Sequence, residues 1–186
     1  FRSVGQHGIG LDYLKRALDL VDAQPVPDRA RHGELLVEMG DVNLLLLRPQ
    51  TALDQYAEAW QALSGDDPSM IARRDALLGQ PFLLAGPEPA ALTFKARRVP
   101  PRERAGALAD GVVVARLGVD EQGRPHDIVV EESNPPGMLD EHVVSALRGS
   151  LFRPRLADGL AVPTRNTIYR HEFRYARSEL REKDQA

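Results

Sequence analysis

The side chains best suited to chemistry do not form a recognisable reactive set in this sequence. Five histidines are present, and none of them stands in the HExxH spacing that places two metal ligands on one helix face. Glu172 follows His171 directly, but neighbours on a strand point to opposite faces of a sheet. We therefore interpret all five as surface or sheet residues and predict no metal site: His7, His32, His126, His142 and His171.

Nucleophile and phosphate-binding patterns are equally weak. Ser133 and Ser145 lack the flanking glycines of a nucleophile elbow. Gly5, Gly8 and Gly10 precede a helical pattern but follow no predicted strand, so they do not form a dinucleotide fingerprint. The chain contains no cysteine, which excludes disulfides and thiol catalysis. We predict a protein that is not an enzyme and uses no cofactor.

Composition indicates a globular protein and gives no sign of a nucleic-acid binder. The 186 residues are 42% hydrophobic and 27% charged, with a formal net charge of -3, so a basic surface for nucleic acid is not expected. The longest apolar run, Leu44 to Leu47, is far shorter than the roughly 20 residues that span a bilayer. Because the chain begins at Phe1 rather than methionine, we expect a piece of a longer protein, in which any membrane anchor lies upstream.

The elements that would position a binding site begin with helices in residues 1–79. An apolar stripe from Leu11 to Val21 predicts a first helix, which Pro25 closes. Further helices are predicted at about 31–47 and 49–63, and a fourth, capped by Asp67 or Ser69, runs to Leu78.

The second and third of these helices carry a more specific pattern. The stretch "LLVEMGDVNLLLLRPQTALDQYAEAWQALSGDDP" has small residues at Gly40 and Ala52 and an aromatic residue at Tyr56. In this spacing it resembles a tetratricopeptide repeat, with partial repeats on either side. The alternative is an ordinary helical hairpin packed as a bundle.

A tetratricopeptide array lines its concave surface with its first helices, so the resemblance implies a peptide groove on the second predicted helix. In the matched register the groove would be an apolar strip with an acidic rim, suited to a basic peptide: Glu34, Val37, Asp41 and Leu44. The alternative is that these residues pack against a neighbouring repeat or the following linker.

Prolines then change the character of the chain. Five of them between 81 and 101 disfavour regular structure, so residues 80–108 are predicted to be a linker. After it, alternation places Val113, Ala115, Leu117 and Val119 on one face of a strand. A turn, a second strand, a helix at 139–148 and a long strand from 161 to 175 complete a small α+β unit of about three antiparallel strands.

The order of these elements and seven of their residues resemble the C-terminal domain of TonB-type energy transducers, over about residues 100–175. The matching residues are the turn glycine Gly123, Ser133 after the second strand, Phe152 and Pro154 after the helix, and Gly159 with Val162 and Pro163 in and after the next turn. The tyrosine-proline pair that usually precedes the first strand in this family appears here only as "VPP", residues 99–101.

The resemblance implies a periplasmic protein of the Gram-negative cell envelope, anchored to the inner membrane by an upstream segment. It also implies binding of an outer-membrane transporter by strand addition, without nucleic acid or other cofactors. The pairing edge would be the last strand: Thr167, Ile168, Tyr169, Arg170, His171, Glu172 and Phe173. The alternative is a non-transducing envelope scaffold or adaptor, which binds peptides through its repeats or forms a homodimer through this strand.

The sequence thus predicts an α+β protein with four parts. These are a tetratricopeptide-like helical domain at 1–79, a proline-rich linker at 80–108, a TonB C-terminal-like domain at 109–177 and a charged tail at 178–186.

Overall fold

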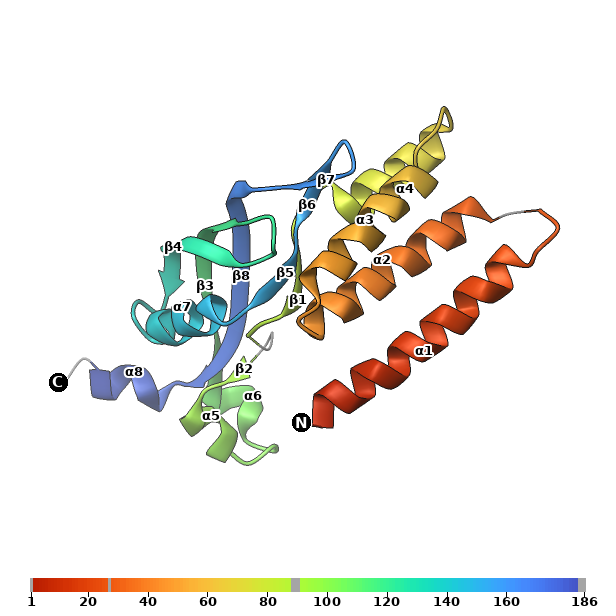
Figure 1. Cartoon of the computed structure of the whole chain (residues 1–186). Helices are drawn as coiled ribbons and strands as arrows, with labels where there is room; N and C mark the ends of the chain where they lie inside the picture. The colour runs from red at the N-terminus through yellow and green to blue at the C-terminus, as the bar shows by residue number, and fades with distance from the viewer. Residues whose placement is uncertain (1, 27, 88–90, 184–186) are drawn as a thin grey trace. The chain divides into compact units, whose positions relative to one another are not determined.

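A computed structural model of the chain describes residues 2–26, 28–87 and 91–183 (Figure 1). The described chain forms two compact units, and neither is a single stretch of sequence. Unit 1 consists of Phe1–Ala85, Val119–Arg124 and Leu151–Thr164. Unit 2 consists of Gly86–Gly118, Pro125–Ser150 and Arg165–Ala186. The four predicted parts stay predictions, and residues 88–90 and 184–186 of the predicted linker and tail lie outside the described residues.

The helices of unit 1 begin and end where local chemistry predicts. They are α1 (Arg2–Asp22), α2 (Arg29–Leu45), α3 (Pro49–Ala62) and α4 (Pro68–Leu78). Asp28 caps α2 by accepting a hydrogen bond from the Arg31 N–H at 2.9 Å, and Asp67 caps α4 by accepting from the Ser69 N–H at 2.8 Å.

The close approach of α2 and α3 explains the small residue at Gly40. A Cβ atom there would lie 2.4 Å from Cε1 of Tyr56, so the tyrosine ring occupies the space that a side chain would need. Tyr56 and Ala52 are fully buried, as the repeat pattern predicts. The helical character of this region is therefore confirmed, while its identity as a tetratricopeptide repeat stays a prediction.

Short strands complete unit 1. β1 (Phe82–Ala85) pairs antiparallel with β5 (Leu151–Arg153), and β6 (Arg155–Ala157) pairs antiparallel with β7 (Leu160–Val162). Asp158 and Gly159 turn the β6–β7 hairpin with φ of +52° and +79°, the positive values that such tight turns require. The predicted long strand from 161 is thus interrupted, because Pro163 has no N–H to continue the ladder.

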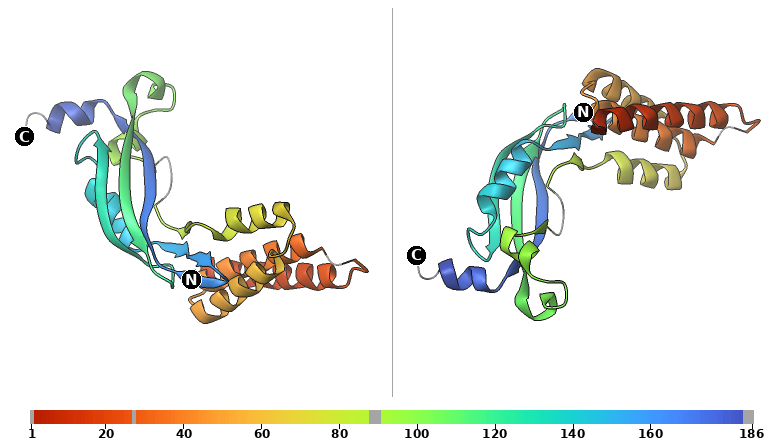
Figure 2. Two further views of the ribbon diagram at one scale, coloured as in Figure 1. Left: turned by 90° about the horizontal axis from the view of Figure 1, so that it is seen from above. Right: turned by 90° about the horizontal axis from the view of Figure 1, so that it is seen from below.

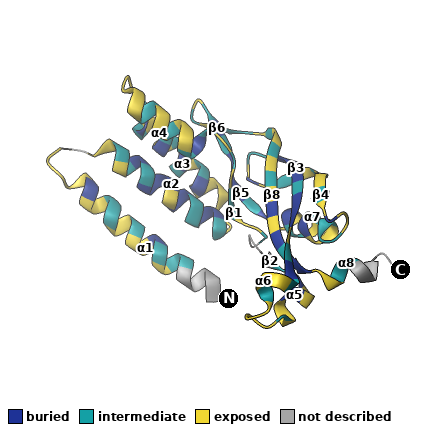
Figure 3. Ribbon diagram, turned by 180° about the vertical axis from the view of Figure 1, so that it is seen from behind, coloured by how far each residue is buried: buried dark blue, intermediate teal, exposed yellow. Residues whose placement is uncertain are grey.

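Unit 2 contains a four-stranded sheet in the order β2-β8-β3-β4 (Figure 1). The strands are β2 (Ala91–Leu92), β3 (Leu108–Val119), β4 (Pro125–Asn134) and β8 (Thr164–Ala176). α7 (Asp140–Arg148) packs beside β4 and buries Val143 and Leu147 (Figure 2). The predicted inward face of β3 is confirmed, since Val113, Ala115 and Leu117 are fully buried (Figure 3). The α+β class is therefore confirmed, and β2 is a strand that the sequence did not predict.

Regular structure also continues through much of the predicted linker. Besides β1 and β2 it contains α5 (Phe94–Arg98) and α6 (Arg104–Ala107), and α8 (Ser178–Lys183) follows the sheet. The Thr93 hydroxyl caps α5 by accepting from the Ala96 N–H at 3.3 Å, and Ala96 packs in a small core with Leu108 and Ala176. Pro81, Pro87, Pro100 and Pro101 fall between these elements rather than inside them, which is why regular structure is possible here.

Candidate binding surfaces

The outer edge of β8 is only partly covered. β2 pairs with it in parallel at Ala91↔Phe173 and Leu92↔Arg174, and the Thr93 N–H donates to the Arg174 carbonyl at 3.0 Å. The N–H and C=O groups of successive residues in a strand point to opposite edges, so residues an even number of positions apart share an edge. The backbone groups of Ile168 and Arg170 therefore point to the same edge as those of Arg174. Among residues 2–26, 28–87 and 91–183, no other strand pairs along this edge.

Side chains alternate along β8 in the same way. Ile168 is 56% exposed, and Arg170 and Glu172 are exposed and form an ion pair at 3.0 Å between Nε and Oε1. Thr167 and Tyr169 are half-buried, whereas His171 and Phe173 are buried (Figure 3). The predicted binding residues 167–173 therefore include both exposed and buried side chains. At Phe173, the edge of β8 is already paired with β2.

The inward residues of β8 form a ladder of rings that supports the strand. The ring centroids of Tyr169 and His171 lie 6.2 Å apart, as do those of His171 and Phe173. Burial, and to a smaller extent electrostatic repulsion from His142, lowers the pKa of His171 and favours its neutral form. Its Nδ1 lies 3.3 Å from the Tyr169 hydroxyl, and its Nε2 has no hydrogen-bond partner among the described residues. His171 thus belongs to the packing of the sheet, as predicted.

A hollow of about 450 Å³ adjoins the same strand. Val112 and Phe173 contribute apolar lining, and Arg170, Glu172 and Arg174 add charged groups. Gly111 has no side chain here, since a Cβ atom would lie 2.4 Å from Cζ of Phe173. The hollow offers room for a side chain of a segment that pairs with β8.

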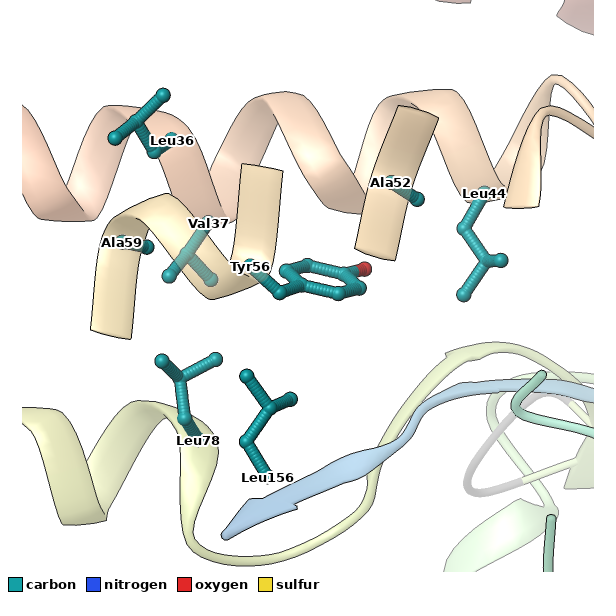
Figure 4. Packing of buried hydrophobic residues seen from close by; sticks show 8 residues of the cluster. All are labelled: Leu36, Val37, Leu44, Ala52, Tyr56, Ala59, Leu78 and Leu156. Carbon is teal, nitrogen blue, oxygen red and sulfur yellow. The ribbon is translucent and has the colours of Figure 1, made fainter. Parts of the chain in front are cut away.

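The predicted groove on α2 is covered by the chain itself. Val37 and Leu44 are each 2% exposed and belong to one cluster with Tyr56 and Leu156 (Figure 4). Glu34 lies at the rim, where its carboxylate pairs with Arg31 at 3.3 Å and with Arg73 at 3.0 Å. The structure thus packs Val37 and Leu44 in one core, and binding of an outside peptide there stays a prediction.

Asp41, the fourth groove residue, holds a buried polar network. Its carboxylate accepts from the Tyr56 hydroxyl at 2.8 Å and from Arg153 at 3.0 and 3.2 Å. Burial raises the pKa of Asp41, and the charge of Arg153 opposes this shift. Burial and the Asp41 charge raise the pKa of Tyr56 well above its ordinary value, so its hydroxyl stays a hydrogen-bond donor.

Sequence reasoning missed Arg153, the partner of Asp41. Its side chain is only 7% exposed, and its guanidinium lies 4.9 Å from the centre of the Phe82 ring. The one available signal was an arginine flanked by Phe152 and Pro154. An arginine in such a place must find a carboxylate partner if it is buried.

Metal sites and membrane-spanning helices are two features that bear on function. Among residues 2–26, 28–87 and 91–183, no three histidine or acidic side chains converge as a metal site would require. In the same part of the chain, no helix combines the length and the apolar character needed to cross a bilayer.

Comparison with known families locates one domain. Residues 99–175 match the family described as Gram-negative bacterial TonB protein C-terminal, which is less than half of the chain. No curated protein matches the sequence. The resemblance to a TonB C-terminal domain is thus confirmed, and the match supports a protein-interaction role in the Gram-negative envelope. The turn residues Gly123 and Gly159 and the strand residue Phe152 of this domain lie in unit 1.

Proposed function

We propose that the protein is a periplasmic interaction module that grips an outer-membrane transporter by adding a strand to the free edge of β8, in the manner of a TonB-type energy transducer. The observation that carries the proposal is the edge of β8 at Ile168 and Arg170, which no other described strand covers and which lies within the part of the chain that matches the TonB family. β2 supports it as well, because this short extended segment already pairs with the same edge.

The grip should be weak and reversible. Ile168 and Arg170 each offer one donor and one acceptor, and a backbone hydrogen bond contributes a net ~0.5 to 1.5 kcal/mol. Ordering a flexible peptide costs about 1 to 2 kcal/mol for each residue that is fixed. Further free energy must come from side chains that enter the adjoining hollow. A low affinity suits an energy transducer that must bind and release its partner repeatedly.

The experiment is photo-cross-linking in cells with a photoreactive residue in place of Ile168 in the full-length protein. A matched control carries it in place of Val129, which is 47% exposed on β4 of the same sheet. Adducts to an outer-membrane transporter from position 168, but not from 129, are expected. Equal adducts from both positions would contradict strand addition at β8.

A pair of substitutions separates the backbone from the side chain. Arg170→Pro removes the outward N–H and leaves the groups that face β3 in place, whereas Arg170→Ala removes only the side chain. We expect the proline variant to lose the adducts and the alanine variant to keep them.

The second candidate is an envelope scaffold or adaptor that does not transduce energy. The same open edge would serve a homodimer, since two copies of β8 can pair with each other. Adducts from position 168 only to a second copy, or only to proteins of the periplasm, would favour this function over transduction.

A further inference from the structure

An extended segment of the chain lies where the helical hairpin would receive a peptide. Residues 151–157 form β5 and β6, and Pro154 separates the two strands. Leu156 packs with Val37 and Tyr56 in the cluster of Figure 4, and Leu151 packs against the same cluster. Both ends of the inserted segment 151–164 are boundaries of unit 1, so the segment enters from unit 2 and returns to it.

Arg153 provides a specific polar contact in this segment. Its Nη1 donates to both carboxylate oxygens of Asp41, at 3.0 and 3.2 Å, and the residue is 5% exposed. The Phe82 ring covers the guanidinium, with its centre 4.9 Å away. Arg155, two residues further on, has no polar partner among the described residues. The contact therefore distinguishes one arginine of the segment from the other.

The charge of the α2 face fits such a ligand. Glu34, Glu38 and Asp41 follow each other at helical spacing, and the carboxylate of Glu38 is half exposed. Arg31 pairs with both glutamates, and Arg73 pairs with Glu34, so the segment itself pairs with the third carboxylate of this face. The buried carboxylate of Asp41 requires a hydrogen-bonding cation, since an unpaired charge inside a protein is strongly unfavourable.

We propose that the α2–α3 surface is a peptide-binding groove specific for an extended segment in which an arginine lies between two leucines, and that residues 151–156 occupy it in cis. An outside protein with a segment of this kind would bind only by displacing them. The proposal does not depend on strand addition at β8.

The first test is a binding titration with a fluorescent peptide that copies residues 150–158. Two analogues of the peptide carry Arg153→Gln or Arg155→Gln. The protein is the whole chain with Leu156→Ala, which weakens the cis segment, or with Leu160→Ala as the matched control. Leu156 is 2% exposed and Leu160 is 69% exposed on the same β6–β7 hairpin.

We expect the Leu156→Ala protein to bind the peptide at least about tenfold more tightly than the Leu160→Ala protein, because the apparent affinity rises with the fraction of open groove. The Arg153→Gln peptide should lose about tenfold or more, and the Arg155→Gln peptide should bind like the parent. Equal binding by both proteins, or equal loss for both analogues, would overturn the proposal.

Hydrogen–deuterium exchange on the unmodified chain covers the case in which Leu156→Ala does not fold. Millimolar peptide should raise exchange across residues 151–162 while α2 stays protected. Exchange in 151–162 that does not change with the parent peptide would show that the segment is fixed core rather than a displaceable ligand.

Discussion

Replacing Arg153 with methionine tests the buried network of unit 1 most directly. Methionine keeps much of the length and apolar volume of the side chain, but it removes the charge that lies over the Phe82 ring and both hydrogen bonds to Asp41. Asp41 is then left with the Tyr56 hydroxyl as its partner in the network. The variant therefore isolates the cost of a buried carboxylate that has lost its cation.

The magnitude follows from burial. Breaking a buried ion pair by removing one partner costs about 3 to 5 kcal/mol. Because the Asp41 side chain is 20% exposed, water recovers part of this loss, and we expect a loss near the lower end of that range. With a urea dependence of about 1 to 3 kcal/mol per M, the unfolding midpoint should fall by about 1 to 3 M.

Urea unfolding followed by the fluorescence of Trp60 is the assay, since this only tryptophan of the chain lies on α3 in unit 1. The double variant with Asp41→Asn keeps an acceptor for Tyr56 and buries no charge at either position. It should recover to within about 1 kcal/mol of the unmodified protein. A single Arg153→Met variant that loses less than about 1 kcal/mol, or a double variant as unstable as the sum of the singles, would refute the reasoning.

Three further substitutions test packing and pH dependence. Gly40→Ala should destabilise unit 1 by about 1 to 3 kcal/mol, because its Cβ would lie 2.4 Å from Tyr56, as judged by Trp fluorescence in urea. Gly10→Ala, with no atom within 4 Å of its Cβ, should instead stabilise α1 by about 0.5 to 1 kcal/mol; the opposite order would contradict the packing argument. Because burial lowers the pKa of His171, the unfolded chain takes up a proton first, so stability should fall as pH drops below about 6.5. His171→Phe should reduce this dependence in amide exchange of β8, and an unchanged dependence would exclude His171 as a source.

Local chemistry accounts for what the sequence predicted well. Helix ends follow from Asp67, Pro49 and Gly79, and the turn at Asp158–Gly159 needs residues that accept positive φ. Such signals act over a few residues and do not depend on the rest of the fold.

The association of residues 151–164 with the helices could not be predicted in the same way. Asp41 and Arg153 are separated by 112 positions, and neither periodicity nor capping links them. β2 was missed for a related reason, since two residues paired with β8 leave no pattern of alternation. In both cases the deciding interaction lies between distant segments.

The two predicted surfaces therefore differ in what they offer a partner at first contact. Val37 and Leu44 are each 2% exposed, so a peptide reaches them only after residues 151–156 leave, whereas Ile168 is 56% exposed on a strand edge that no other described strand covers. A partner can bind the β8 edge without any prior displacement of another segment. Its apparent affinity there is therefore not reduced in the way that it is at the groove, where only the small fraction of molecules with residues 151–156 displaced can bind. We therefore expect partners to meet the β8 edge first, and the α2–α3 groove to respond only to a segment that can outcompete Arg153 for Asp41.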